Sequence, residues 1–129
     1  MSMFMTELCA DLVKDDKVWK LTKELIYWSD LLDSLVTVPV GFQTDLASVP
    51  RLPVAYWFWG GKAHREGVLH DYLYRIDAEP AASFDDANSA FLEAMESRGK
   101  PFYVRWPMYA GVCVGGYPSY HQKKVRDEL

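Results

Sequence analysis

The stretch VLHDYLYR, residues 68–75, places His70 and Asp71 side by side within an otherwise apolar run. The apolar residues of this run recur at helical spacing, and successive residues of a helix point about 100° apart. The two side chains therefore do not bond to each other, and each needs its own partner. This arrangement is typical of a histidine that acts as a general base while the adjacent aspartate faces a cation. The alternative is a satisfied polar pair at the edge of the core, with Asp71 paired to Arg75.

A further polar residue, Asn88, shares the apolar stripe of a second predicted helix with Phe91. A buried amide without a hydrogen bond costs about 1–3 kcal/mol, so Asn88 needs a partner. In a helical hairpin its amide would face His70 or Tyr74. An asparagine that accepts from one imidazole nitrogen fixes the tautomer and leaves the other nitrogen to act as a base. The candidate catalytic residues are therefore His70, Tyr74 and Asn88.

Two predicted helices position these residues. The first covers residues 62–77. The second begins after Ser83, which is a good N-cap because its hydroxyl accepts from a backbone amide of the first turn. Acidic residues follow in that turn, where the helix dipole favours them. Gly99 is suited to end the helix. Together these segments predict a helical hairpin.

The first half of the chain carries the β-branched and aromatic residues of short strands, in 17–29, in 35–40 and at the start of 41–51. These segments predict an antiparallel meander of three or four strands. The apolar segment 102–116 fits a helix or a strand equally well. We expect one domain, 1–129, of the α+β class: a small antiparallel β-meander followed by a helical hairpin and an apolar C-terminal segment.

Residues near the strands have a structural and a functional interpretation. Asp45 either stabilises a turn or binds a metal ion together with Asp71. Arg51 either anchors the strands to the helices through a carboxylate or binds an anionic group. An aromatic cluster follows, which is either core or, if exposed, an interface for a partner protein or a lipid surface. It consists of Tyr56, Trp57, Phe58 and Trp59.

The metal at Asp71 would be calcium by preference, because carboxylate oxygens are hard ligands. Zinc is a further option, since the chain has enough ligands in His64, His70, Asp71 and His121. However, no HExxH motif or paired histidine spacing on one helix face accompanies them.

Composition argues against several classes of protein. The net charge of −4 argues against a nucleic-acid binder, since phosphate binding needs a dense basic face. Two widely spaced cysteines predict neither a disulfide framework nor a zinc site. No apolar run reaches the roughly 20 residues of a membrane span, and no secretory signal begins the chain. We therefore expect a soluble protein made in a reducing cytoplasm.

Three segments recur together, in this order, in a known family: VPVGFQTDLASVPR (38–51), VLHDYLYR (68–75) and ANSAFLEAM (87–95). In these the chain resembles a family of small uncharacterised proteins that tailed phages and prophages encode. The resemblance covers most of the chain and implies a phage protein in the host cytoplasm, the virion or both. Family members more often have aspartate at position 88, which puts a His–acid dyad in doubt for this chain.

A shorter match concerns His70, Asp71 and Tyr74, which are similar to the HD-x-x-Y core of phospholipase A2. This resemblance implies that His70 activates a water molecule and that Asp71 holds calcium with backbone carbonyls of an upstream loop. Tyr74 would belong to the orienting network. Asn88 stands where the partnering acid belongs.

Two functions therefore compete. The first is a virion, tail or assembly protein whose partners are other phage proteins, with oligomerisation left open and with His70, Tyr74 and Asn88 as a buried polar lock. The second is a calcium-assisted His–Asp hydrolase that acts on envelope esters or lipids. An enzyme derived from a His–acid dyad would keep its acid, so Asn88 favours the first function.

Overall fold

The computed structural model describes residues 1–15, 18–45, 64–127 and 129. The residues predicted to bind partners, Arg51 and the cluster from Tyr56 to Trp59, lie outside the described residues. The side chain of His64 also lies outside the described part, although its backbone begins the first described helix.

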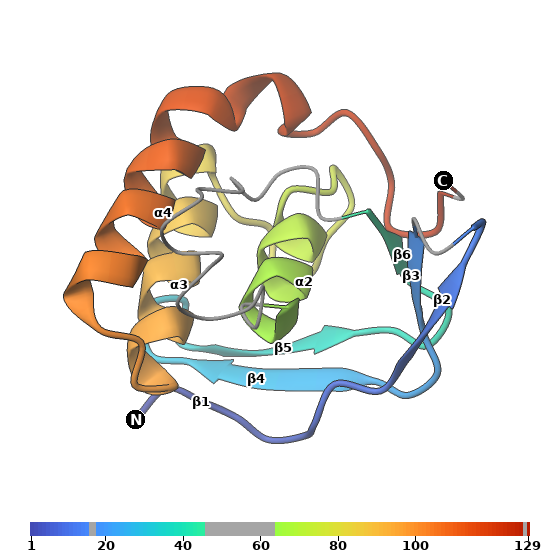
Figure 1. Cartoon of the computed structure of the whole chain (residues 1–129), viewed down its shortest axis with the longest axis horizontal. Helices are drawn as coiled ribbons and strands as arrows, with labels where there is room; N and C mark the ends of the chain where they lie inside the picture. The colour runs from blue at the N-terminus through green and yellow to red at the C-terminus, as the bar shows by residue number, and fades with distance from the viewer. Residues whose placement is uncertain (16–17, 46–63, 128) are drawn as a thin grey trace.

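Six described strands form two antiparallel sheets, of order β1-β4-β5 and β2-β3-β6 (Figure 1). The strands are β1 Met3–Phe4, β2 Ala10–Val13, β3 Val18–Leu21, β4 Leu25–Ser29, β5 Ser34–Val38 and β6 Gln43–Thr44. The α+β class is confirmed, but the predicted meander is divided between two sheets. The run 17–29 breaks at 22–24, where consecutive polar residues are exposed and the chain passes from one sheet to the other.

The β4–β5 hairpin buries one face of its sheet. Leu25 and Tyr27 of β4 pair with Val38 and Val36 of β5, and all of them are buried. The residues between them on each strand are only partly buried or exposed. This alternation is what the two-residue period of a strand requires when one face packs on a core.

The second half forms the helices α2 His64–Leu73, α3 Phe84–Ser97 and α4 Phe102–Gly115, followed by the short 3-10 helix η1 Tyr117–Ser119. The hairpin of α2 and α3 is confirmed. Ser83 Oγ accepts from the Asp86 amide at 3.0 Å, and Gly99 follows the end of α3 with φ +76°. The segment 102–116 is almost entirely helical, and its inward face packs on α3.

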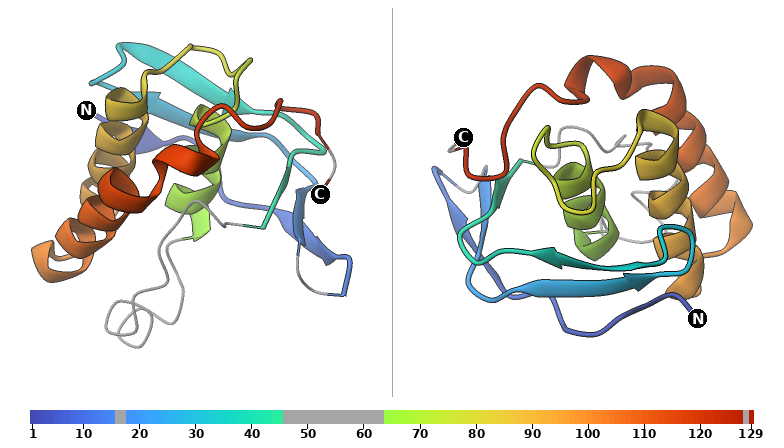
Figure 2. Two further views of the ribbon diagram at one scale, coloured as in Figure 1. Left: turned by 90° about the horizontal axis from the view of Figure 1, so that it is seen from above. Right: turned by 180° about the vertical axis from the view of Figure 1, so that it is seen from behind.

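The helices stack in layers beside the sheet β1-β4-β5. α2 lies at the centre of the molecule, α3 packs against it, and α4 covers the other side of α3 (Figures 1 and 2). One core cluster joins β4 and β5 to α2 and α3, and a second joins α3 to α4. No described helix has both the length and the apolar character to cross a membrane.

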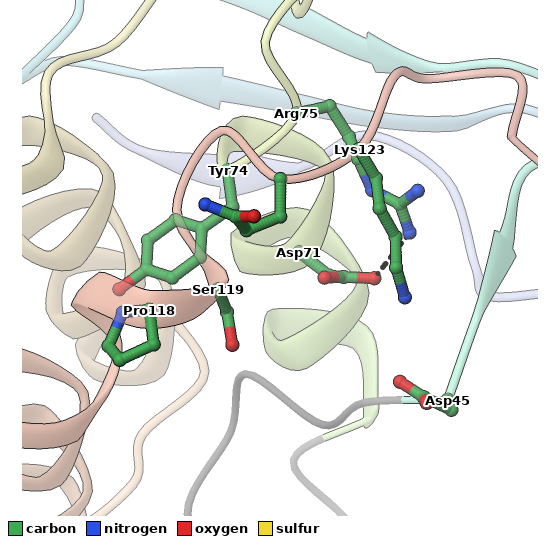
Figure 3. A pocket seen from close by; sticks show the side chains of 8 residues that line it. Asp45, Asp71, Tyr74, Arg75, Pro118, Ser119 and Lys123 are labelled. Atoms are coloured by element: carbon green, nitrogen blue, oxygen red, sulfur yellow. Dashed lines mark hydrogen bonds and ion pairs between the residues drawn. The ribbon is translucent and has the colours of Figure 1, made fainter.

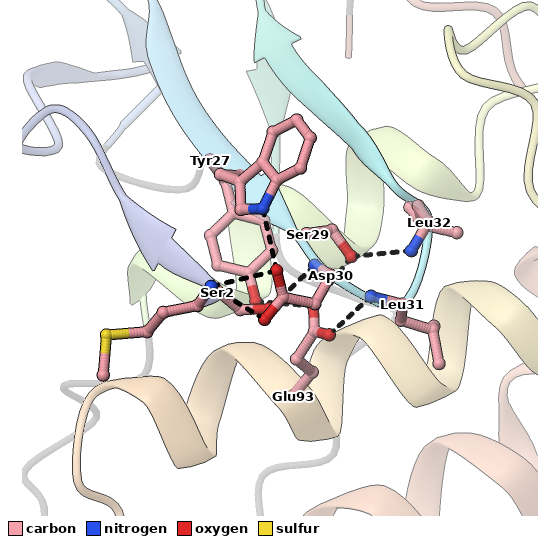
Figure 4. A network of polar contacts seen from close by, with 9 residues as sticks. Ser2, Tyr27, Ser29, Asp30, Leu31, Leu32 and Glu93 are labelled. Atoms are coloured by element: carbon pink, nitrogen blue, oxygen red, sulfur yellow. Dashed lines mark hydrogen bonds and ion pairs between the residues drawn. The ribbon is translucent and has the colours of Figure 1, made fainter.

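A carboxylate on α3 ties this helix to the sheet. Glu93 Oε1 accepts from the Tyr27 hydroxyl at 2.8 Å and from the Ser29 hydroxyl at 2.7 Å (Figure 4). Its Oε2 accepts from the Leu31 amide at 2.9 Å, in the turn between β4 and β5. One side chain therefore fixes α3, and the residues on it, relative to the sheet.

Candidate functional site

The structure brings His70, Tyr74 and Asn88 into direct contact between α2 and α3. His70 Nε2 lies 2.8 Å from Asn88 Oδ1, and the Tyr74 hydroxyl donates to the same oxygen at 2.6 Å. The expectation that Asn88 faces His70 or Tyr74 is confirmed, and in fact it meets both. An amide oxygen can only accept, so in this arrangement the imidazole hydrogen is on Nε2.

The cluster is closed to solvent on every described side. His70 and Asn88 have no exposed surface, and Tyr74 is 1% exposed. The imidazole packs on two rings, with its centroid 4.1 Å from that of Tyr74 and 4.8 Å from that of Phe91. Burial lowers the pKa of His70 from 6.5 to about 4, although the hydrogen bond to Asn88 and the charge of Asp71 partly oppose this. The ring is therefore neutral at neutral pH.

Asp71 points away from this cluster, as the helical spacing predicts. Its Oδ2 accepts from Arg75 at 2.9 Å, so the i,i+4 pairing considered from the sequence is present. Arg75 is only 3% exposed and also donates to the carbonyls of Gln43, at 2.9 Å, and Lys124, at 3.1 Å. Its guanidinium lies 4.8 Å from the centre of the Phe42 ring. Arg75 thus joins α2, β6 and the C-terminal segment.

Asp45 and Asp71, the two predicted metal ligands, line one pocket of about 220 Å³ (Figure 3). They come from the end of β6 and from α2. The complete lining is Asp45, Asp71, Tyr74, Arg75, Pro118, Ser119, Gln122 and Lys123. Two carboxylates beside two cations make this pocket polar and of mixed charge. A cation there would compete with Arg75 for Asp71.

The described residues contain no cluster of three or more His, Cys, Asp or Glu side chains that could hold a metal ion. Of the proposed zinc ligands, His70 lies inside the buried cluster and His121 stacks on Tyr120, with 3.7 Å between ring centroids. Metal binding by Asp45 and Asp71 stays a prediction.

The family model for "Protein of unknown function (DUF1353)" matches residues 19–112. The chain belongs to this family. The DUF1353 region runs from β3 into α4 and so includes the whole buried cluster and Asp71. Among curated proteins and among solved structures, no significant match was found.

A second buried polar contact lies within the DUF1353 region, and we did not predict it from the sequence. Glu66 of α2 has no exposed surface, and its Oε1 accepts from Arg98 at 2.9 Å. Among the residues that the structure describes, its Oε2 has no hydrogen-bond partner. Burial raises the pKa of Glu66, while the charges of Lys100 and Arg98 oppose this. The residue looks like an ordinary surface glutamate in sequence, and only its tertiary position distinguishes it.

Two residues after the predicted hairpin complete the surroundings of Asn88. Cys113 Sγ lies 3.9 Å from the Asn88 side-chain nitrogen, at the length limit of a hydrogen bond to sulfur. Gly116 is buried, and a Cβ there would collide with the Tyr74 hydroxyl and the Val112 carbonyl. The backbone after α4 thus approaches Tyr74 so closely that any side chain at position 116 would force a neighbouring atom to shift.

Proposed function

We propose that this DUF1353 protein is a non-catalytic binding protein of a tailed phage or prophage, either a component of the virion, such as its tail, or an assembly protein. The order of the motifs VPVGFQTDLASVPR, VLHDYLYR and ANSAFLEAM supports the phage origin. The partners would be other phage proteins, met in the host cytoplasm during assembly or within the particle.

The burial of His70 is the observation that carries the non-catalytic interpretation. A general base must reach the proton that it abstracts, directly or through one water molecule. His70 has no exposed surface, and one of its nitrogens is bonded to Asn88. A pKa of about 4 also places it below the range in which a base works best near neutral pH. These features support a polar lock that holds α2 against α3.

A binding protein needs a surface for its partner, and α4 offers one. Large apolar side chains on α4 and directly after it are at least half exposed. They are Phe102, Tyr103, Trp106, Val114 and Tyr117. Exposed apolar side chains that gather on one element in this way are typical of interaction sites. The aromatic cluster from Tyr56 to Trp59 is the other predicted surface and lies outside the described residues.

The proposal is tested by His70→Gln in the phage genome, with His70→Ala and a deletion of the gene alongside. Glutamine keeps an N–H donor for Asn88 but cannot act as a base. We expect folded His70→Gln protein, verified by circular dichroism, to sustain a particle yield near that of the wild type. The deletion should lower the yield. A folded His70→Gln protein with a yield as low as the deletion would overturn the proposal.

A calcium-assisted hydrolase is the second candidate, because Asp45 and Asp71 line the same pocket. In that case Asp71 and Asp45 would hold the cation, and His70 would become the base only after α2 and α3 separate enough to admit a substrate. The test is thermal unfolding with added calcium, zinc or magnesium. A rise of several degrees in Tm with calcium, lost in Asp71→Asn, would favour this function.

A further inference from the structure

Helix α4 is apolar on both of its faces. Val104, Met108 and Val112 form the inward face and pack on α3. The opposite stripe, at a spacing of four residues, consists of Phe102, Trp106, Ala110 and Val114, all of them exposed. Phe102, Trp106 and Val114 have 66%, 50% and 87% of their surface exposed, respectively. A surface helix normally carries polar residues on its outer face, and one that is apolar all round is normally buried.

The outer stripe also contains no charged group. Arg105 is the one charged residue of α4, and it lies off the stripe with its guanidinium donating to the Lys100 carbonyl at 2.8 Å. Burying the stripe in an interface would therefore take no charged group out of water. The desolvation of charged groups is the main electrostatic cost of forming an interface.

The order of side-chain sizes along the stripe indicates what covers it. The large Phe102 and Trp106 occupy the first half, and the small Ala110 and Val114 occupy the second. The stripe is symmetric about Met108: residues 102 and 114 lie equally far from it, as do residues 106 and 110. In an antiparallel pair whose two-fold axis passes beside Met108, Trp106 lies opposite Ala110 and Phe102 lies opposite Val114. Because packed helix axes lie about 8–10 Å apart, a large side chain needs a small one opposite it.

Charge argues against a lipid surface as the alternative. Asp85 and Asp86 are exposed in the first turn of α3, near the end of α4, because the two helices form an antiparallel hairpin. The basic residues near the start of α4 have partners or are buried: Arg98 pairs with Glu66, Arg105 donates to the Lys100 carbonyl, and Lys100 is 4% exposed. A net charge of −4 also gives the chain no overall attraction to an anionic bilayer.

We propose that α4 is the contact of a two-fold symmetric homodimer, in which the outer stripes of two antiparallel α4 helices pack large residue against small. This contact is isologous, so each pair of facing residues occurs twice. The inference rests on the binding role proposed above in its use of α4 as a surface, and it assigns that surface to a second copy of this chain. A phage partner bound elsewhere on the chain would leave it unchanged.

The experiment is sedimentation equilibrium of the full chain over about 1 to 300 µM, the range in which a small interface dissociates. The wild type should approach twice the 14.8 kDa of one chain as its concentration rises. Ala110→Trp places a tryptophan opposite Trp106 of the second copy. It should raise the dissociation constant of the dimer by about tenfold or more, because overpacking is costly. Trp106→Ala should also weaken the dimer. The double variant Trp106→Ala, Ala110→Trp exchanges large for small and should restore association.

The outcomes that would overturn the antiparallel homodimer are the following. A stripe that is merely adhesive, or that binds lipid, should become stronger with Ala110→Trp. The wild type and variants are therefore also spun with phosphatidylglycerol vesicles. A monomeric wild type at all concentrations, co-sedimentation with vesicles, or a double variant no tighter than the single ones would contradict the antiparallel pairing. Positions 106 and 110 are both exposed, so we expect every variant to fold. A Tm close to that of the wild type will verify this.

Discussion

The side chains of His70 and Asn88 join α2 to α3 through a hydrogen bond of 2.8 Å that no solvent reaches. The other contacts between these two helices are mostly apolar and therefore non-directional. A buried polar contact of this kind makes one relative placement of the helices better than its neighbours, because any shift leaves polar groups without partners. Tyr74, bonded to the same amide oxygen, strengthens this preference.

Stability should fall as the pH drops from 6.5 to 4, because of His70. The pKa of His70 is about 4 in the folded protein and 6.5 in the unfolded chain. Between these values the unfolded chain binds more protons, so acid favours unfolding. At about 1.4 kcal/mol per pKa unit, the loss is about 3 kcal/mol once the pH reaches 4. Above pH 6.5 this contribution is constant. Urea unfolding at a series of pH values measures it.

His70→Gln is the matched control for this titration. It keeps a side-chain donor and has no group that titrates in the same range. Carboxylates titrate in both proteins, so the difference between the two pH profiles isolates the histidine. Profiles that run parallel from pH 7 to pH 4 would contradict the low pKa of His70.

Asn88→Asp should raise the pKa of His70. A carboxylate at position 88 would place a negative charge within hydrogen-bonding distance of Nε2 and stabilise the imidazolium. We expect a rise of about 2 pKa units, because a close opposite charge offsets much of the cost of burial. Titration by NMR would follow the ring protons of the three histidines. An unchanged titration of the His70 ring in Asn88→Asp would show that Nε2 does not face residue 88.

The contact of His70 with Asn88 could be predicted because its evidence is local. Helical spacing indicates which residues share a face, and a polar amide on an apolar stripe requires a partner. The cap at Ser83 follows from similarly local chemistry. The same reasoning could not decide whether residues 102–116 form a helix, because both faces of that segment are apolar and periodicity then carries no information.

Contacts between distant segments escaped the sequence reasoning. The sequence predicts for Arg75 only the pairing with Asp71, but Arg75 also bonds to carbonyls 32 and 49 residues away in sequence. Glu66 meets Arg98, which is likewise 32 residues away. Nothing in a single sequence marks such a residue as buried, because its burial depends on how the elements pack. The division of the strands into two sheets depends on packing in the same way.

Arg75→Met should loosen the C-terminal segment. The substitution keeps most of the apolar stem but removes the donors to the Gln43 and Lys124 carbonyls and to the Asp71 carboxylate. We expect a loss of about 2–4 kcal/mol in the free energy of unfolding, as for other broken buried networks. Hydrogen exchange of the Val125 amide, which donates to Asp77, should accelerate more than that of amides in α3.

The control for Arg75 is Asp71→Asn. It removes the charge of the partner but leaves both carbonyl contacts of Arg75 in place, so its cost should be clearly smaller. If Asp71→Asn destabilised the protein as much as Arg75→Met, the ion pair rather than the bridge between segments would be the main contribution of Arg75.

Gly116→Ala should destabilise the protein, whereas Gly115→Ala should not. A Cβ at position 116 meets the Tyr74 hydroxyl and the Val112 carbonyl, but a Cβ at position 115 would meet no described atom within 4 Å outside the adjacent backbone of its own helix. We expect Gly116→Ala to cost about 1–3 kcal/mol, the usual range for overpacking, as measured by urea unfolding. Gly115→Ala should be neutral or stabilising by up to about 1 kcal/mol, since alanine favours the helix. Tyr74→Phe removes one of the two clashing atoms, so Gly116→Ala should cost less in that background. An equal cost in both backgrounds would mean that the hydroxyl does not approach Gly116, and that the Val112 carbonyl alone restricts this position.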